Sequence, residues 1–196
     1  MHISVALIVA LAMLSACSHS PAKTPTPAPA SHEMLDEQTG TTLTVVTKPL
    51  VFARERSDVA AHTRDYATLV AVEVDSSGKY SEYLLLYRWS TVDRRMSPAP
   101  DPGAGELKIL AEGRVIDLTP MEQLPVSLSR RRELYVPEHG DLVAHAYSVD
   151  AATLRFIATS RELSVIMPQE PLKIPFALWE DGRPALGQFV QGANGP

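Results

Sequence analysis

The chain has 196 residues, with 18 Lys and Arg against 23 Asp and Glu, which gives a net charge of −5 near pH 7. Residues 33–196 contain 17 of the basic and all 23 of the acidic residues, so this part carries about −6. Mild acidity argues against nucleic-acid binding, which requires a basic face, and offers no polybasic attraction to anionic lipid. About 164 residues suit one domain that buries a core without disulfides or metal.

An uncharged apolar run over residues 3–13 is followed by Leu14-Ser15-Ala16-Cys17, which contains the only cysteine. The run is too short to cross a bilayer as a helix, which needs about 20 residues, but it fits the apolar segment of a secretory signal. The stretch resembles the lipobox of bacterial lipoprotein signal peptides. Before the run stand only Met1 and His2, whereas such signals usually begin with a basic residue.

This resemblance implies cleavage between Ala16 and Cys17, diacylglycerol on the Cys17 thiol, and an acyl group such as palmitate on the new N-terminus. Several acyl chains anchor a protein stably, because each buried CH₂ contributes about 0.8 kcal/mol. Ser18 stands where an Asp favours inner-membrane retention in the enteric version of the family, so we expect the outer membrane, facing the periplasm, in a Gram-negative source. Acylation leaves no thiol for a disulfide or for catalysis.

Residues 17–32 form the predicted tether, in which four prolines alternate with small or polar residues. This composition cannot bury a core and favours extended polyproline II segments. At about 3.1 Å per residue, the tether could hold the following domain up to roughly 45 Å from the membrane. We therefore expect three parts: a cleaved signal over 1–16, the acylated tether over 17–32, and a single domain over 33–196.

Apolar and β-branched residues predict strands over 42–47 and 50–54, with a bend at Lys48-Pro49 between them. Strands over 67–75 and 80–89, joined by a four-residue turn containing a glycine, predict an antiparallel hairpin. Both faces of 80–89 are apolar in the middle, which indicates a central strand covered on both sides.

A Pro- and Gly-rich loop over 97–105 precedes a second predicted hairpin over 106–118, and Thr119-Pro120 is expected to begin a short helical turn. Residues 150–160 have helical spacing and a cap at Asp150, although some of their apolar residues also alternate; the cap and the paired alanines favour a helix. Four further segments are predicted strands: 133–136, 141–149, 163–167 and 176–179.

A turn over 182–184 and a frayed end over 191–196 complete the pattern. The predicted fold is mainly β, at the margin of α+β. It consists of an antiparallel sheet or sandwich with one short helix near 150–160.

Histidine and carboxylate occur together in residues 138–145, where His139 and His145 lie near Glu138 and Asp141. Such groups can bind zinc, but their spacing fits no known zinc pattern, and a solvated turn followed by a strand histidine is the favoured interpretation. Nucleotide-binding glycine loops and serine-nucleophile motifs are absent from the sequence. We therefore predict no catalytic, cofactor-binding or metal residue.

Arg130-Arg131-Arg132 could grip phosphate or an acidic glycan, but an exposed loop is the favoured interpretation, and Asp93-Arg94-Arg95 is partly self-neutralising. Paired carboxylates, as in Glu180-Asp181 and Asp36-Glu37, leave glycosidase chemistry open but more often lie on solvated surface. Several aromatic residues could line a groove, although their strand spacing favours the core or a half-covered face. These residues are Tyr80, Tyr83, Tyr87 and Trp89.

We expect a lipid-anchored envelope lipoprotein, held in membrane lipid through Cys17, whose domain is a non-enzymatic binding or accessory module with a protein partner or another envelope component. The alternative is a periplasm-facing enzyme of hydrolase type, with a site assembled from residues distant in sequence. A pocket with converging His, Asp or Glu side chains would favour the enzyme, and an exposed apolar patch would favour the binding module.

Overall fold

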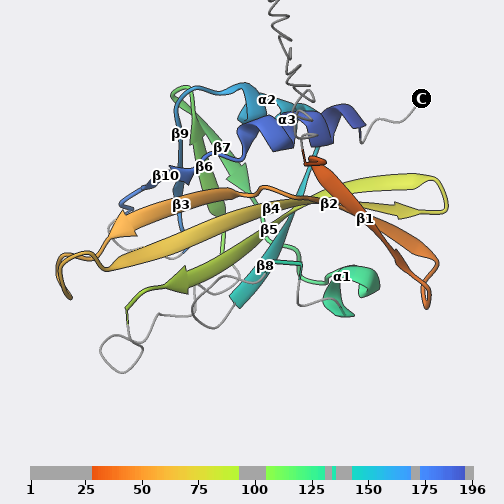
Figure 1. The fold of residues 1–196 in the computed structure, drawn as a ribbon, viewed down its shortest axis with the longest axis horizontal. Coiled ribbons are helices and arrows are strands. Elements are labelled where there is room, and N and C mark those ends of the chain that lie inside the picture. Colours follow the sequence, from red (N-terminus) through yellow and green to blue (C-terminus); the bar gives the residue numbers. More distant parts are fainter. Residues whose placement is uncertain (1–27, 93–104, 131–133, 136–142, 169–172, 193–196) are drawn as a thin grey trace, which may run out of the picture.

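The computed structural model in Figure 1 describes residues 28–92, 105–130, 134–135, 143–168 and 173–192. The signal, most of the tether, Asp93-Arg94-Arg95, Arg131-Arg132 and the 138–141 stretch lie outside these residues, as does the side chain of Arg130. The described strands are β1 (Ser31–Asp36), β2 (Thr41–Val46), β3 (Leu50–Glu55), β4 (Arg64–Ser76), β5 (Lys79–Ser90), β6 (Leu107–Ala111), β7 (Arg114–Leu118), β8 (Val143–Val149), β9 (Leu163–Ile166) and β10 (Phe176–Glu180). The described helices are α1 (Val126–Arg130), α2 (Ala151–Thr159) and α3 (Arg183–Gly192).

Strand β4, with 13 residues, is the strand around which the sheet is arranged. Its first half pairs with β3 and its second half with β2, while β5 pairs along its other edge. β2 and β3 thus run as one interrupted strand, broken at Lys48-Pro49, where proline supplies no N–H for the ladder. The predicted β4–β5 hairpin is confirmed, and its turn places Ser77 and Gly78 at positive φ, as the tightest hairpin turns require.

The described strands form one antiparallel sheet whose path curves back on itself. From β4 the path runs through β3, β10, β9 and β6 to β7 on one side, and through β5 to β8 on the other. Just after β7, Pro120 forms a bridge with Tyr147 of β8, and the Met121 N–H donates to the Ala146 carbonyl. The two ends of the path therefore meet, and the apolar side chains of both strand groups share one core.

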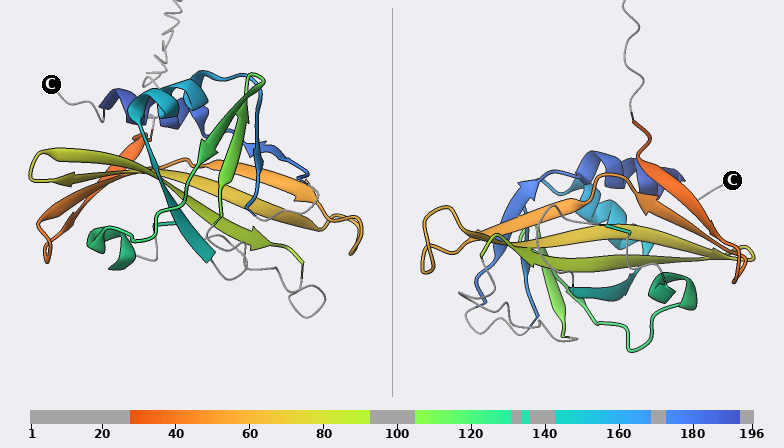
Figure 2. Two further views of the ribbon diagram at one scale, coloured as in Figure 1. Left: turned by 180° about the vertical axis from the view of Figure 1, so that it is seen from behind. Right: turned by 60° about the horizontal axis from the view of Figure 1, so that its bottom comes forward.

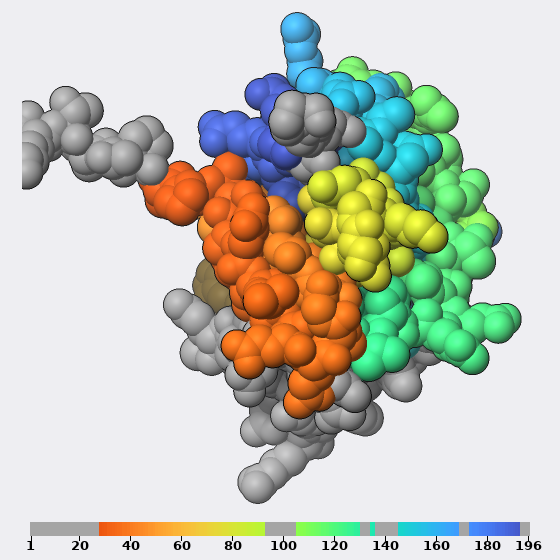
Figure 3. Space-filling view, turned by 90° about the vertical axis from the view of Figure 1, so that its right-hand side faces the viewer, coloured from red at the N-terminus to blue at the C-terminus, as the bar shows by residue number. Residues whose placement is uncertain are grey.

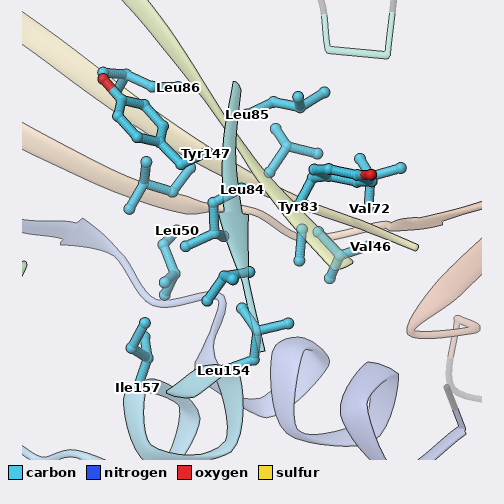
Figure 4. Close-up of a cluster of buried hydrophobic side chains, with 14 of the residues drawn as sticks. Val46, Leu50, Val72, Tyr83, Leu84, Leu85, Leu86, Tyr147, Leu154 and Ile157 are labelled. Atoms are coloured by element: carbon cyan, nitrogen blue, oxygen red, sulfur yellow. The ribbon is translucent and has the colours of Figure 1, made fainter. Parts of the chain in front are cut away.

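Helices cover both faces of the layer made by β3, β4 and β5, with α2 and α3 on one side and α1 on the other (Figure 2). Leu154 and Ile157 of α2 are fully buried, and Figure 4 shows them beneath Leu50 and Leu84 of the sheet. On β5, the consecutive residues Leu84, Leu85 and Leu86 are at most 5% exposed, which confirms the prediction that the middle of 80–89 is covered on both faces.

Several predictions need correction or refinement. Helix α2 and its Asp150 cap are as predicted, and the Asp150 carboxylate accepts a hydrogen bond from the Thr153 N–H at 2.6 Å. The predicted helical turn at Thr119-Pro120 is wrong, because Pro120 is drawn into the bridge with β8. Leu134 and Tyr135 form no strand, and Tyr135 packs on the core instead.

Helices α1 and α3 and strand β1 were not expected from the sequence. α3 includes residues 183 and 184 of the predicted turn over 182–184 and the first two residues of the predicted frayed end. Its buried residues, Leu186, Phe189 and Val190, recur at helical spacing, so packing against the sheet stabilises a helix that begins with Arg-Pro and contains two glycines. β1 begins at Ser31, two residues before the predicted start of the domain.

The bend between β2 and β3 depends on Gly182, because a Cβ at this position would lie 2.3 Å from the Pro49 carbonyl oxygen and 2.5 Å from that of Lys48. Gly182→Ala should therefore lower the free energy of unfolding by about 1–3 kcal/mol, as overpacking against backbone requires. The matched control is Gly187→Ala in α3, whose added Cβ would meet only the Ala158 Cβ, at 3.9 Å. The control should gain roughly 0.5–1 kcal/mol from helix propensity. Denaturant unfolding measures both, and equal effects would contradict the proposed close approach.

Candidate functional site

An exposed tryptophan, Trp179, marks the described surface that best fits a binding role. It belongs to β10, where Leu178 pairs with Phe52 but Glu180 pairs with Val51, so Trp179 is an extra residue at a β-bulge. Bulges re-aim side chains and are frequent near functional sites. Trp179 is 52% exposed, although burial of a tryptophan is usually strongly favourable.

Neighbouring residues hold Trp179 in a defined orientation. The Tyr66 ring meets it edge-on with 6.3 Å between ring centroids, and the Arg64 guanidinium lies 4.5 Å from the indole centroid. Arg64 is itself bonded to Glu55, with 3.0 Å from Nη2 to Oε1. Tyr66 and Arg64 therefore cover one part of the indole and hold the ring in place, and the rest of the ring is exposed.

Behind Trp179, Tyr66 stacks on Trp89 with ring centroids 3.8 Å apart and planes within 5°. The Trp89 Nε1–H donates to the Thr68 hydroxyl at 3.1 Å, so the polar end of the buried stack is satisfied. The indole N–H of Trp179, in contrast, donates to none of the described residues. We call Arg64, Tyr66, Trp89 and Trp179 the aromatic surface.

A buried ion cluster on the opposite face of β4 fixes the strand end that carries the aromatic surface. The Asp65 carboxylate is buried and accepts from Arg54 at 3.2 Å, Arg56 at 3.0 Å and the Ser90 hydroxyl at 2.8 Å. Burial alone raises the pKa of Asp65, but the hydrogen bonds from Ser90, Arg56 and Arg54 outweigh it and hold the pKa below its usual value. Asp65 lies between Arg64 and Tyr66 on β4, and its hydrogen bonds with Arg54 and Ser90 tie this strand end to β3 and β5.

The aromatic residues singled out in the sequence separate into three environments. Tyr83 and Tyr87 are core residues, with Tyr87 against Tyr135 at 5.6 Å between centroids. Trp89 belongs to the aromatic surface, and Tyr80 is 57% exposed at the other end of β5. The structure therefore brings only one of the four to the aromatic surface.

The charged residues singled out in the sequence mostly have local structural roles. Asp36 accepts hydrogen bonds from Thr39 and Gln38 in the β1–β2 turn, and Asp181 pairs with Arg183 at 2.6 Å. His145 lies on β8 opposite Leu86, while His139 and its acidic neighbours fall outside the described residues. Within the described ranges, no three His, Cys, Asp or Glu side chains are placed to hold a metal ion.

Sequence patterns gave no signal for Trp179, Tyr66 or Arg64. The three lie on two strands that are more than 100 residues apart in the chain, and a β-bulge leaves no mark in the alternation of apolar residues. Only the pairing of β10 with β3 and of β3 with β4 brings them together.

Asp65→Asn should lower the free energy of unfolding by about 3 kcal/mol near pH 7, because it removes the buried carboxylate to which the half-buried Arg54 and Arg56 donate. The pKa of Asp65 is depressed, so its stabilisation is present above the unfolded pKa, near 4, and disappears as the pH falls below it. The variant should therefore lose less stability than the native chain on acidification. The exposed Asp58→Asn, which removes only the outer pair with Arg56, is the control and should change little. Equal losses in both variants, measured by urea unfolding at pH 7 and pH 3, would contradict this role.

Comparison with known proteins gives no relative for the chain: no protein-family model, curated protein or solved structure matches it.

Proposed function

We propose that the protein is a lipid-anchored envelope lipoprotein whose β domain binds another envelope component without catalysing a reaction. The observation that carries the proposal is Leu14-Ser15-Ala16-Cys17 directly after the apolar run over 3–13. The proline-rich segment after Cys17 supports it, because such a segment would keep the domain away from the bilayer while leaving it free to reorient.

Two observations on the described part of the domain support the proposal that one part of the chain anchors the protein and another binds. Its chain enters at β1, where the Thr47 hydroxyl donates to the Pro29 carbonyl at 2.7 Å and the Thr47 N–H to that of Ala30 at 2.8 Å. Among the described residues, no helix is both long and apolar enough to cross a bilayer. In this proposal, membrane attachment depends on the acyl chains of Cys17.

The aromatic surface is the proposed contact region for the bound component. Tryptophan, tyrosine and arginine are enriched among the residues that dominate the energetics of protein interfaces. Tryptophan and tyrosine bring large contact areas at a small cost in conformational entropy. Trp179 is half-exposed and already held by Tyr66 and Arg64, so its side chain would lose little conformational entropy on binding.

Cys17→Ala tests the anchor. The variant should lack the acyl mass in whole-protein mass spectrometry and should leave the membrane fraction, because one uncleaved or unacylated segment cannot replace several acyl chains. Ser20→Ala, in the same segment, is the control and should remain acylated and membrane-bound. A Cys17→Ala protein with unchanged mass and membrane association would contradict the lipoprotein assignment.

Trp179→Ala tests the binding surface. In-cell crosslinking from the native envelope should give a defined adduct that weakens at least tenfold in this variant, as expected for a central aromatic contact. Val115→Ala removes a side chain of β7 that is similarly exposed, at 49%, and should leave the adduct unchanged. An adduct that persists in Trp179→Ala would place binding elsewhere, and the complete absence of a specific adduct would contradict the binding role.

A further inference from the structure

Four carboxylates lie on one face of the sheet at the end opposite the aromatic surface. Glu33 of β1 and Glu73 of β4 both pair with Thr44 of β2, and Glu73 also pairs with Glu82 of β5. Asp75 follows Glu73 by two residues and so shares its face. We call Glu33, Glu73, Asp75 and Glu82 the acidic face.

Glu73 is the unusual member of this group. Only 5% of the residue is exposed, and its Oε2 is buried with no hydrogen-bond partner. Burial raises the pKa of Glu73 to about 7, and the carboxyls of Glu82, Asp75 and Glu33 add to the increase. A buried carboxylate that meets only other carboxylates is costly, so this arrangement lowers the stability of the domain whenever Glu73 is ionised.

Among the described residues, the charged groups that shift the pKa of Glu73 are the carboxyls of Glu82, Asp75 and Glu33, and none is basic. Lys48, in the loop after β2, lies in the same hollow as Val46, Ala71 and Leu186, and it is not among the groups that act on Glu73. His32 and Lys79 belong to β1 and β5, but strand alternation places them on the other face. Helix α3, which packs against the same face at Val46 and Ala71 through Leu186, has no basic residue in its last turn. A cation from outside the domain would therefore meet attraction from several sides.

The next row of residues along the same face carries apolar groups. Leu35 and Tyr80 lie in register with Thr42 and Asp75, and they are 58% and 57% exposed. Figure 3 looks onto this end of the molecule, where β1 and β2 (orange) lie beside the β4–β5 hairpin (yellow). The acidic face is thus bordered by exposed carbon surface.

We propose that the acidic face binds an alkylammonium group, with its charged head beside Glu73 and its carbon stem against Leu35 and Tyr80. An ammonium head donates three hydrogen bonds, one of which can go to the unpartnered Oε2 of Glu73. Glu73 and Glu82 occupy directly paired positions, whose Cβ atoms in antiparallel strands are about 5 Å apart, so one ammonium head can lie between their carboxylates.

Titration of the lipidated, full-length chain in detergent micelles, followed by amide NMR at pH 8, tests the site with two probes. They are free 1,5-diaminopentane and the capped peptide Gly-Lys-Gly, and the tighter of the two identifies the source of the ammonium group. The backbone signals of Glu33, Glu73 and Glu82 should shift and saturate with at least one probe. 1,5-Pentanediol, which lacks the charges, should leave them unchanged.

Glu73→Gln should weaken probe binding at least tenfold, while Glu122→Gln, an exposed carboxylate outside the acidic face, should not change it. Binding should also weaken at pH 5.5, where the carboxyl of Glu73 is protonated. Unsaturable shifts with both probes, or equal affinities for native and Glu73→Gln protein, would overturn the proposal. The aromatic surface is not involved, so the outcome is independent of the test with Trp179→Ala.

The melting temperature separates a binding role from a structural one. The pKa of Glu73 is raised above its unfolded value, so the folded state binds the proton more tightly and stability falls as the pH rises from about 4.5 through 7. Glu73→Gln should therefore raise the melting temperature at pH 8 more than at pH 5. A variant that binds less and melts higher supports the proposal, whereas one that melts lower at both pH values assigns Glu73 to the structure.

Discussion

The sharing of β4 between two partners on one edge is the constraint on which the rest of the structure depends. Because β2 and β3 both pair with this single strand, the chain must bend at Lys48-Pro49 without losing register on either side. The bend in turn requires the close approach of Gly182, just after β10 and before α3. The position of β10, and with it the bulge that presents Trp179, therefore follows from how β4 is paired.

The two ends of the β4–β5 hairpin each hold a buried carboxyl group, but the charged groups around it have opposite signs at the two ends. At one end, the buried Asp65 is surrounded by arginines and a hydroxyl, which lower its pKa, and the result is a rigid support for the aromatic surface. At the other end, the buried Glu73 is surrounded by carboxylates, which raise its pKa. The surroundings of Asp65 stabilise the folded state near neutral pH, whereas those of Glu73 destabilise it. A bound cation that neutralises the carboxylates around Glu73 would explain this second arrangement.

Local sequence patterns were sufficient for the elements whose periodicity is strong. The β4–β5 and β6–β7 hairpins and helix α2 could be predicted because alternation, turn residues and a capping Asp150 all agree. α3 was missed because its Arg-Pro start and glycines indicate a turn, and packing against the sheet overrides them. The aromatic surface and the acidic face could not be predicted, since both arise from pairings between distant strands and, for Trp179, from a bulge.

Native-state hydrogen exchange tests most directly whether β4 unites the sheet. If it does, the amides of Ala67 and Leu69, opposite β3, and those of Val72 and Val74, opposite β2, exchange only through global unfolding and give the same free energy. Edge strands such as β1 should open at lower free energies. Different free energies for the two halves of β4 would show that the β2 and β3 sides open as separate units, and this would contradict the account.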